Sequence, residues 1–465
     1  MIIDYFIALA YVFSLPILGW IFSFFVLGKW FQEKNLFIKI PLSFIKGNFL
    51  MSFFLHFIYF FNYGFVLTKE SFFVYLVIVL GIWLGLVLPK EIKRITVYEI
   101  VTFLLLLSFF FPFFKESLFS FLFAWDPVAI WMLKAKAFFF SNSFWETSLY
   151  LEKNNYLYAH KAYPVGIPLI VSFYYKIINF VNDQAVKVYF MLFYFNIFLF
   201  FIGVIYEQGK RFFFTKLMFS LGFLLAPLFI LFSYNGYMDL PLSFGFVILI
   251  YLLKELIVNK QRSLIYVIAS ISFSLGFVLK IKYEAMPFSV FYLFAVSWVV
   301  WYRFRGKKVF REILVRLFVY VLFSLSSYLM WRLFLFESGL KVYFQPTITE
   351  LSNIIYRAYN LYNWYFVELI DTSRFGVLIL ITLVFLVIEV VSLFFSKDRI
   401  HLILFIIILL QILFYNFVYL FMPLYLEKVF FNSFERLFLH IMPSILFIVI
   451  HYFYIIEKAV LKKRM

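Results

Sequence analysis

The residues best suited to chemistry lie between positions 124 and 168, in the longest polar stretch of an otherwise apolar chain. Asp126 stands between Trp125 and Pro127, and Lys134 follows two turns later on the same face of the helix that we expect to begin there. A carboxylate can accept a proton and an ammonium group can bind a phosphate. Each residue also has a structural interpretation, Asp126 as a helix N-cap and Lys134 as a side chain that extends to the membrane surface.

A second polar group begins the apolar segment that follows, and it consists of His160, Lys161 and Tyr163 beside two prolines. Cationic groups and free N–H donors at the head of a helix can bind a phosphate. The alternative is an anchor of aromatic and basic side chains at the membrane interface.

Three further polar features interrupt later apolar runs. Asp239 opens one run and could be either a site residue or a cap. The turn with Lys280 and Glu284 is either a simple loop or a functional pair of ions near membrane depth. Arg436 and His440 are four residues apart, so they share a helical face and could bind one anion together.

The composition identifies the class of protein. The chain has 465 residues, 65% of them hydrophobic, and a mean hydropathy of +0.98, which indicates a polytopic membrane protein. The net charge of +17 does not indicate nucleic-acid binding, because the cations cluster between apolar runs. Cysteine is absent, which excludes disulfides and thiolate chemistry. The sequence has no phosphate-binding glycine loop and no zinc spacing among its five histidines.

We expect an all-α fold with about thirteen transmembrane helices, because backbone groups in lipid must be satisfied within each segment. The apolar runs begin near residues 5, 48, 71, 97, 186, 212, 238, 263, 284, 313, 375, 400 and 436. One of these runs contains Glu389 deep in the expected helix.

The basic clusters then predict the topology, since cytoplasmic loops are rich in Lys and Arg. They are Lys29/Lys34/Lys39/Lys46, Lys90/Lys93/Arg94, Lys210/Arg211/Lys216, Lys254/Lys260/Arg262, Arg303/Arg305/Lys307/Lys308/Arg311, Lys397/Arg399 and Lys462/Lys463/Arg464. All fall on one side only if residues 162–175 do not cross the membrane, so we expect an interfacial or re-entrant helix there. The N-terminus is then external, the C-terminus is cytoplasmic, and the polar features meet at the external face.

This topology divides the chain into three parts. Residues 1–96 form N-terminal transmembrane helices of unknown role. Residues 97–456 form the membrane domain that carries the candidate site, with a large external loop at 115–185. Residues 457–465 are a basic cytoplasmic tail.

The order of the motifs resembles that of a known superfamily. Trp-Asp-Pro and Lys-Ala-Lys at 125–136 are followed by His-x-x-Tyr-Pro at 160–164, Gly-Tyr-Met-Asp at 236–239, Leu-Lys-Ile-Lys-Tyr-Glu at 279–284 and Ser-Phe-Glu-Arg-Leu-Phe-Leu-His at 433–440. Over residues 97–456 the chain resembles the GT-C polytopic glycosyltransferases, such as the protein O-mannosyltransferases and lipid A sugar transferases. The resemblance implies a polyprenyl-phosphate-linked sugar donor and transfer at the external membrane face.

The resemblance also implies roles for individual residues. Asp126 would be the general base, and Lys161 or His160 would contact the lipid phosphate. Family members often have a second acid next to the first, but Pro127 occupies that position here. This departure puts a two-carboxylate or metal-binding version in doubt, although a divalent ion could still bind if Asp126 meets Asp239 or Glu284 in three dimensions.

The expected function is therefore an inverting membrane glycosyltransferase that transfers a sugar from a polyprenyl-phosphate donor to a lipid, glycan or protein acceptor. Asp126 would act as base, and the expected substrate-binding residues are Lys134, His160, Lys161, Tyr163, Asp239, Lys280, Glu284, Arg436 and His440. The expected location is the bacterial inner membrane, with the site facing the exterior and with membrane lipids rather than nucleic acid as partners. A transporter or flippase of lipid-linked saccharides is the alternative, and a scaffold protein is a third possibility.

Overall fold

The structure is a computed structural model that describes residues 2–120, 122, 124–151, 160–209, 213–258, 264–307, 310–340, 351–370, 384, 387, 391, 399–421 and 426–464. Within these ranges the protein is helical and has no strand, so the predicted all-α class is confirmed for the described residues.

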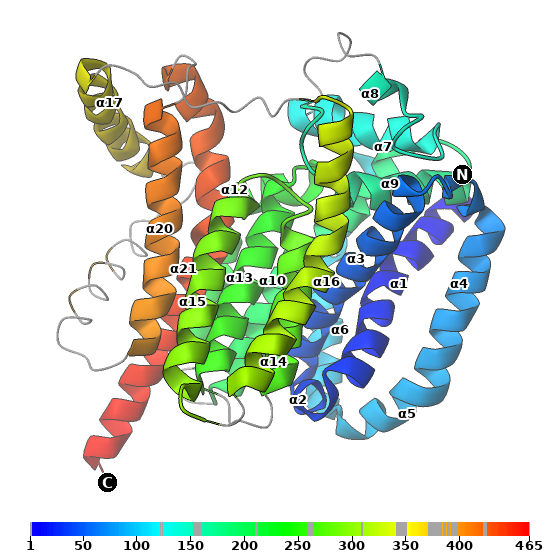
Figure 1. Cartoon of the computed structure of the whole chain (residues 1–465). Coiled ribbons are helices and arrows are strands. Elements are labelled where there is room, and N and C mark those ends of the chain that lie inside the picture. Colours follow the sequence, from blue (N-terminus) through cyan, green and yellow to red (C-terminus); the bar gives the residue numbers. More distant parts are fainter. Residues whose placement is uncertain are drawn as a thin grey trace.

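The long helices form an elongated bundle (Figure 1). They are α1 (Ile2–Val26), α3 (Leu36–Phe60), α4 (Lys69–Ile82), α6 (Val97–Phe119), α10 (Asp183–Glu207), α13 (Asp239–Val258), α14 (Leu264–Val278), α15 (Ala285–Phe304), α16 (Phe310–Glu337), α17 (Leu351–Ile370), α20 (Arg399–Phe421) and α21 (Leu426–Arg464). The shorter helices are α2 (Gly28–Gln32), α5 (Leu88–Glu91), α7 (Leu133–Phe139), α8 (Ser148–Leu151), α9 (Gly166–Ile178), α11 (Phe213–Leu224) and α12 (Pro227–Tyr234). Two π-helical segments, η2 (Trp83–Val87) and η4 (Pro127–Met132), precede α5 and α7.

Ten of the described helical segments are long and apolar enough to cross a membrane, which identifies an integral multi-pass membrane protein. An eleventh span exists if α11 and α12, which bend by 60° at their junction, are taken together. Helix α14 has 15 residues and is shorter than a usual span. The segment near residue 375, with Glu389, lies outside the described residues, so the number thirteen stays a prediction.

The two ends of the bundle carry different short helices and different chain termini (Figure 1). Helices α7, α8 and α9 lie at the end that also carries the N-terminus, and we call this the α7 end. Helices α2 and α5 and the C-terminus lie at the opposite end, the α2 end. The basic residues Lys29 and Lys90 belong to α2 and α5, so these cations lie at the end of the bundle opposite to α7, α8 and α9.

Helix α3 begins earlier in the chain than the sequence predicts. The Asn35 side chain accepts a hydrogen bond from the Ile38 N–H, and the Glu99 carboxylate accepts one from the Leu36 N–H, so both groups cap the helix at its start. As a result Lys39 and Lys46 are buried inside α3 rather than exposed in a loop. The expectation that they mark a cytoplasmic loop is therefore wrong.

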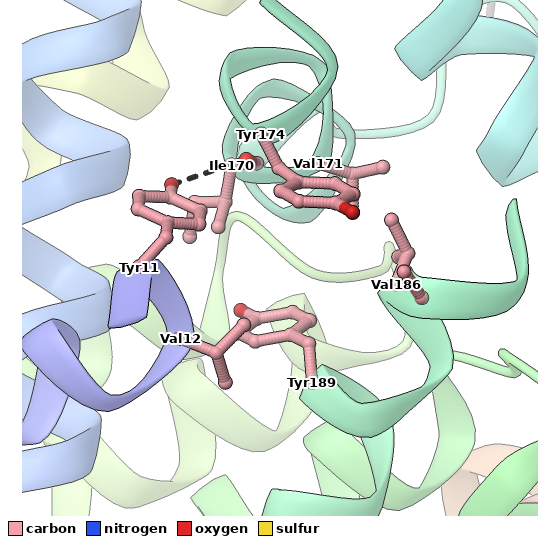
Figure 2. Close-up of a pocket in the computed structure, with 8 residues that line it drawn as sticks. Tyr11, Val12, Ile170, Val171, Tyr174, Val186 and Tyr189 are labelled. Carbon is pink, nitrogen blue, oxygen red and sulfur yellow. Dashed lines mark hydrogen bonds between the residues drawn. The ribbon is translucent and has the colours of Figure 1, made fainter. Parts of the chain in front are cut away.

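Helix α9 has 13 residues and a length of about 20 Å, which is too short to cross the hydrocarbon core. Every residue in it except Lys176 is buried, because α9 packs against α7 and α3 within the bundle. The Tyr11 hydroxyl of α1 donates to the Ile170 carbonyl at 3.1 Å, beside a cavity of only about 10 Å³ that Tyr174 and Tyr189 also line (Figure 2). Helix α9 is therefore held by packing on several sides, and it supports α7.

The opposite placement of the two ends can be tested by labelling, and the natural absence of cysteine makes the chain a ready background. We expect W125C and R305C, both at exposed positions, to react with a membrane-impermeant maleimide from opposite sides of the membrane. The cysteine-free parent is the control and should remain unlabelled. Labelling of both variants from the same side would contradict the topology.

Candidate functional site

A cavity of about 250 Å³ lies among segments from five distant parts of the chain. Its lining comes from η4, the turn at residues 160–163, the turn at residues 282–284, and helices α20 and α21. Its charged lining side chains include Asp126, Lys282, Glu284 and Arg436. The fold therefore gathers ionisable groups that the sequence spreads over more than 300 positions, from 126 to 436.

Asp126 has helical backbone angles (φ −60°, ψ −44°) directly before η4, and its side chain makes no cap hydrogen bond within the described part of the chain. One carboxylate oxygen instead lies 2.6 Å from Nη2 of Arg436. Segments of π-helix are frequent at functional sites, and η4 carries two other lining residues, Ile130 and Trp131. Asp126 is thus held by an ion pair at the cavity rather than by a capping bond.

Asp239 is the centre of the charge network, and its side chain is fully buried. Its carboxylate lies 2.9 Å from Nζ of Lys282, 3.3 Å from Nε of Arg436 and 2.8 Å from Nε2 of His440. A buried carboxylate is tolerated only when cations and hydrogen bonds compensate it, and three partners from two other segments do so here.

Arg436 bridges the two aspartates, since its guanidinium binds Asp126 with one nitrogen and Asp239 with another. The guanidinium also lies over the ring of Tyr237, 5.0 Å from its centroid. His440, one turn later on α21, reaches Asp239 with Nε2 and the hydroxyl of Tyr415 with Nδ1, at 3.0 Å. The predicted pairing of Arg436 and His440 on one helical face is present, and both residues bind a carboxylate of the protein.

The charged side chains of the turn at residues 280–284 point in two directions. Lys282 and Glu284 face the cavity, and Lys280 faces away from it. Lys282 contacts Asp239 and also Oε1 of Glu284, at 3.2 Å. Burial alone would raise the pKa of Glu284, but the Lys282 ammonium and a backbone hydrogen bond outweigh it, so the pKa lies below its usual value and the carboxyl is ionised at neutral pH. Its second oxygen, Oε2, is buried and has no hydrogen-bond partner among the described residues.

Lys280 points away from the cavity, in contrast to the expectation that it binds substrate. Its ammonium is buried, lies 3.3 Å from the Phe49 carbonyl and sits 4.5 Å from the centroid of the Phe49 ring. Burial lowers the pKa of Lys280 well below its usual value. Lys282 occupies the place that the sequence suggested for Lys280, because alternate positions of this turn face opposite sides.

His160 and Tyr163 line the cavity, whereas the described lining includes neither Lys134 nor Lys161. Lys134 is fully buried and donates to the carbonyls of His160 (2.9 Å) and Tyr163 (3.1 Å). It therefore positions the turn and does not extend to the membrane surface. Burial and the nearby Lys134 lower the pKa of His160, so its imidazole is neutral at pH 7. Lys161 is buried beside this turn.

A close backbone contact joins the two turns that carry His160 and Glu284. The Gly166 N–H donates to the Lys280 carbonyl at 3.0 Å, and the Tyr283 hydroxyl donates to the Ala162 carbonyl. A Cβ added at Gly166 would lie 2.7 Å from the Lys280 Cβ and 2.8 Å from its carbonyl oxygen. Only glycine allows this approach.

We therefore expect G166A to destabilise the protein by about 1–3 kcal/mol, because the added methyl group overpacks the contact. G81A on α4 is the matched control, since nothing lies within 4 Å of a Cβ there. In a helix interior that change should be neutral or stabilising by up to about 1 kcal/mol. Thermal unfolding of both purified variants is the measurement, and equal midpoints would contradict the close contact.

Within the described residues the geometry offers no evident metal site. Among the described residues, no group of three or more His, Asp or Glu side chains is arranged to hold a metal ion. Asp126, Asp239 and Glu284 do come near one another, as the sequence left open, but Arg436 and Lys282 lie between them as counter-ions.

Lys282 and Tyr415 are among the lining residues that the sequence did not suggest as site candidates. Lys282 was noted only as part of its turn. Tyr415 lies within the apolar run of α20, where a single tyrosine among many gives no signal.

Comparisons with known proteins identify no similar protein. No family model matches the chain, and neither a curated protein nor a solved structure matches it. Function is therefore inferred from the site itself, with the motif resemblance as a second line of support.

Proposed function

We propose that the protein is a GT-C-like membrane glycosyltransferase that moves a sugar from a polyprenyl-phosphate donor to a lipid, glycan or protein acceptor. The observation that supports this most is the pairing of Asp126 with Arg436 on the wall of a cavity of about 250 Å³. That volume lies just below the usual range for small-molecule sites, about 300–1,000 Å³, and suits one sugar better than an oligosaccharide.

In this proposal the acceptor hydroxyl attacks the anomeric carbon while Asp126 takes its proton. The bond from the anomeric carbon to the phosphate oxygen breaks with its electron pair, and polyprenyl phosphate leaves. Arg436 and Lys282 stabilise the negative charge on the departing phosphate. A single displacement inverts the configuration at the anomeric carbon, and it requires no acid because a phosphate is a good leaving group.

The α7 end would face the cell exterior across a bacterial inner membrane, because the basic residues of α2 and α5 favour the cytoplasmic side. A lipid-linked donor would then enter with its phosphate at headgroup level. The amphipathic α17 lies at this end and exposes Ile355, Tyr356, Tyr359 and Tyr362, as expected of a helix at the membrane interface.

A transporter or flippase of lipid-linked saccharides is the second candidate function. Lys46 favours it, because this lysine is buried within α3 and bonds to Ser274 at 2.8 Å, and ionisable groups inside a membrane bundle often mark a transport path. The position of the cavity at one end of the bundle favours the transferase.

The two functions are separated by one experiment. The purified protein in lipid nanodiscs is incubated with a panel of radiolabelled polyprenyl-phosphate sugars and with membrane extract as the acceptor source. Label transferred to an acceptor supports the transferase. Absence of transfer across the panel, together with movement of a labelled donor across the bilayer of proteoliposomes, would refute it in favour of the flippase.

A further inference from the structure

We infer that the ion pair between Asp126 and Arg436 is a latch, in which the carboxylate occupies the anion site of the cavity until a phosphate group replaces it on the guanidinium. This inference rests on the proposed function, in which Asp126 is the base and Arg436 binds the donor phosphate. It adds an order of events. The donor phosphate binds first, and its binding releases the base.

The charge of the network explains why an anion needs such an exchange. Three carboxylates are paired with two cations at distances from 2.6 to 3.3 Å, so the five side chains sum to a charge of −1. They are Asp126, Asp239, Glu284, Lys282 and Arg436. The lining that the structure describes contains no other lysine or arginine. A phosphate is therefore repelled by the acids unless one of them leaves its cation.

Asp126 is the carboxylate that can leave. Its side chain is 19% exposed, makes no capping hydrogen bond, and has Arg436 as its one ion-pair partner in the described part of the chain. Asp239, by contrast, is fully buried and is held by three partners. Glu284 contacts Lys282 rather than the guanidinium, and its second oxygen is buried. Among the three acids, Asp126 therefore loses the fewest contacts when a ligand displaces it.

Arg436 keeps two other contacts when Asp126 leaves. Its Nε remains 3.3 Å from Asp239, and its guanidinium remains over the ring of Tyr237. The contact with Asp126 uses Nη2, which can donate to a phosphate oxygen as it does to a carboxylate. The Arg436 side chain lines the cavity and is 20% exposed, so a ligand in the cavity can reach it.

The exchange couples donor binding to release of the base. Before the donor arrives, the carboxylate of Asp126 is held by the guanidinium of Arg436 at 2.6 Å. Once a phosphate occupies the guanidinium, its negative charge repels the carboxylate, which is then free to accept the proton of an acceptor hydroxyl. The donor must therefore bind before the acceptor can react, and the base stays covered while no sugar is present to transfer.

The test uses the full-length protein in nanodiscs and probes that carry no sugar. Citronellyl phosphate has a phosphate on a short isoprenoid chain, inorganic phosphate has no chain, and citronellol has the chain without the phosphate. Binding is measured as a ligand-dependent shift of the thermal midpoint. We expect D126N to bind citronellyl phosphate about tenfold more tightly than wild type, because a latch that is closed about nine-tenths of the time lowers the affinity by that factor. Citronellol should not distinguish the two proteins.

E284Q is the matched control for charge. It removes one negative charge from the same cavity, but Glu284 is paired with Lys282 and not with Arg436. Its affinity for citronellyl phosphate should stay within about threefold of wild type. D126S is a second variant without the carboxylate, and serine is a favourable residue at the start of a helix, so it should fold and show the same gain as D126N.

The outcomes separate this inference from the proposed function. A gain in D126N or D126S but not in E284Q supports the latch even if the transfer assay finds no transfer, in which case the proposed function alone fails. Such a gain with citronellyl phosphate alone identifies a lipid phosphate as the ligand, and an equal gain with inorganic phosphate identifies the phosphate group itself.

Two results would overturn the latch. Equal gains in D126N and E284Q would mean that only the net charge of the cavity matters. No gain in D126N and D126S, or no binding of either phosphate probe to any of the proteins, would mean that Asp126 does not compete with phosphate for Arg436. Sugar transfer by wild type would leave the proposed function standing in both cases.

Discussion

Replacement of Asp126 by Asn is expected to reduce sugar transfer by roughly 10²–10⁴-fold, the usual contribution of a general base. Asparagine has nearly the same shape, but its amide cannot take the proton of the acceptor hydroxyl. The fold should be preserved, because Arg436 retains Asp239 as a partner and because both members of the Asp126–Arg436 pair are about one-fifth exposed. Initial rates with the labelled polyprenyl-phosphate donor are the measurement.

The matched control for this variant is D183N. Asp183 pairs with Lys136 at 2.6 Å and is partly exposed, so the change also removes one ion pair, but Asp183 does not line the cavity within the described residues. D183N should transfer sugar at a rate near that of wild type. Transfer by D126N at the rate of D183N would refute the assignment of the base.

Replacement of Asp239 by Asn should destabilise the protein by about 3–5 kcal/mol, the typical cost of removing one partner from a buried ion pair. The reason is that Lys282, at 2% exposure, and Arg436 would lose the carboxylate that balances them at the centre of the network. Asp126 and Glu284 remain as partial compensation. Thermal unfolding in detergent and the yield of folded protein are the measurements.

E312Q provides the comparison for D239N. Glu312 pairs with Arg316 at 2.5 Å on α16, but the two side chains are 52% and 43% exposed, and such surface pairs contribute only about 0–1 kcal/mol. We expect its unfolding midpoint to lie close to that of wild type. A D239N midpoint as high as that of E312Q would show that the buried network is not a major source of stability.

The all-helical class and most membrane spans could be predicted from the sequence, because many apolar residues contribute to each span. Long apolar runs mark spans, and nine of the ten spans in the described part of the chain begin near predicted starts, whereas α3 begins at Leu36, twelve residues before its predicted start at 48. The alternation of basic clusters predicted that Asp126, Asp239 and Arg436 would meet at one end. The structure brings these three together within hydrogen-bonding distance.

Details that depend on the direction of single side chains were not predictable. Lys280 and Lys282 are two positions apart in the same turn, and no local pattern indicates that only Lys282 faces the cavity. Lys134 was expected at the membrane surface or on a phosphate, yet it binds two backbone carbonyls, because the turn at residues 160–163 folds over it. Such contacts between distant segments leave no periodic trace in the sequence.

The partners of Asp239 also impose an order on biosynthesis. Lys282 follows it by 43 residues, whereas Arg436 and His440 follow by 197 and 201. At about 5–20 residues per second, α21 emerges from the ribosome roughly 10–40 s after α13. During that interval Lys282 is the only one of these three partners that can pair with Asp239. A chain truncated before α21 should therefore remain as an insertion intermediate that membrane quality-control proteases degrade.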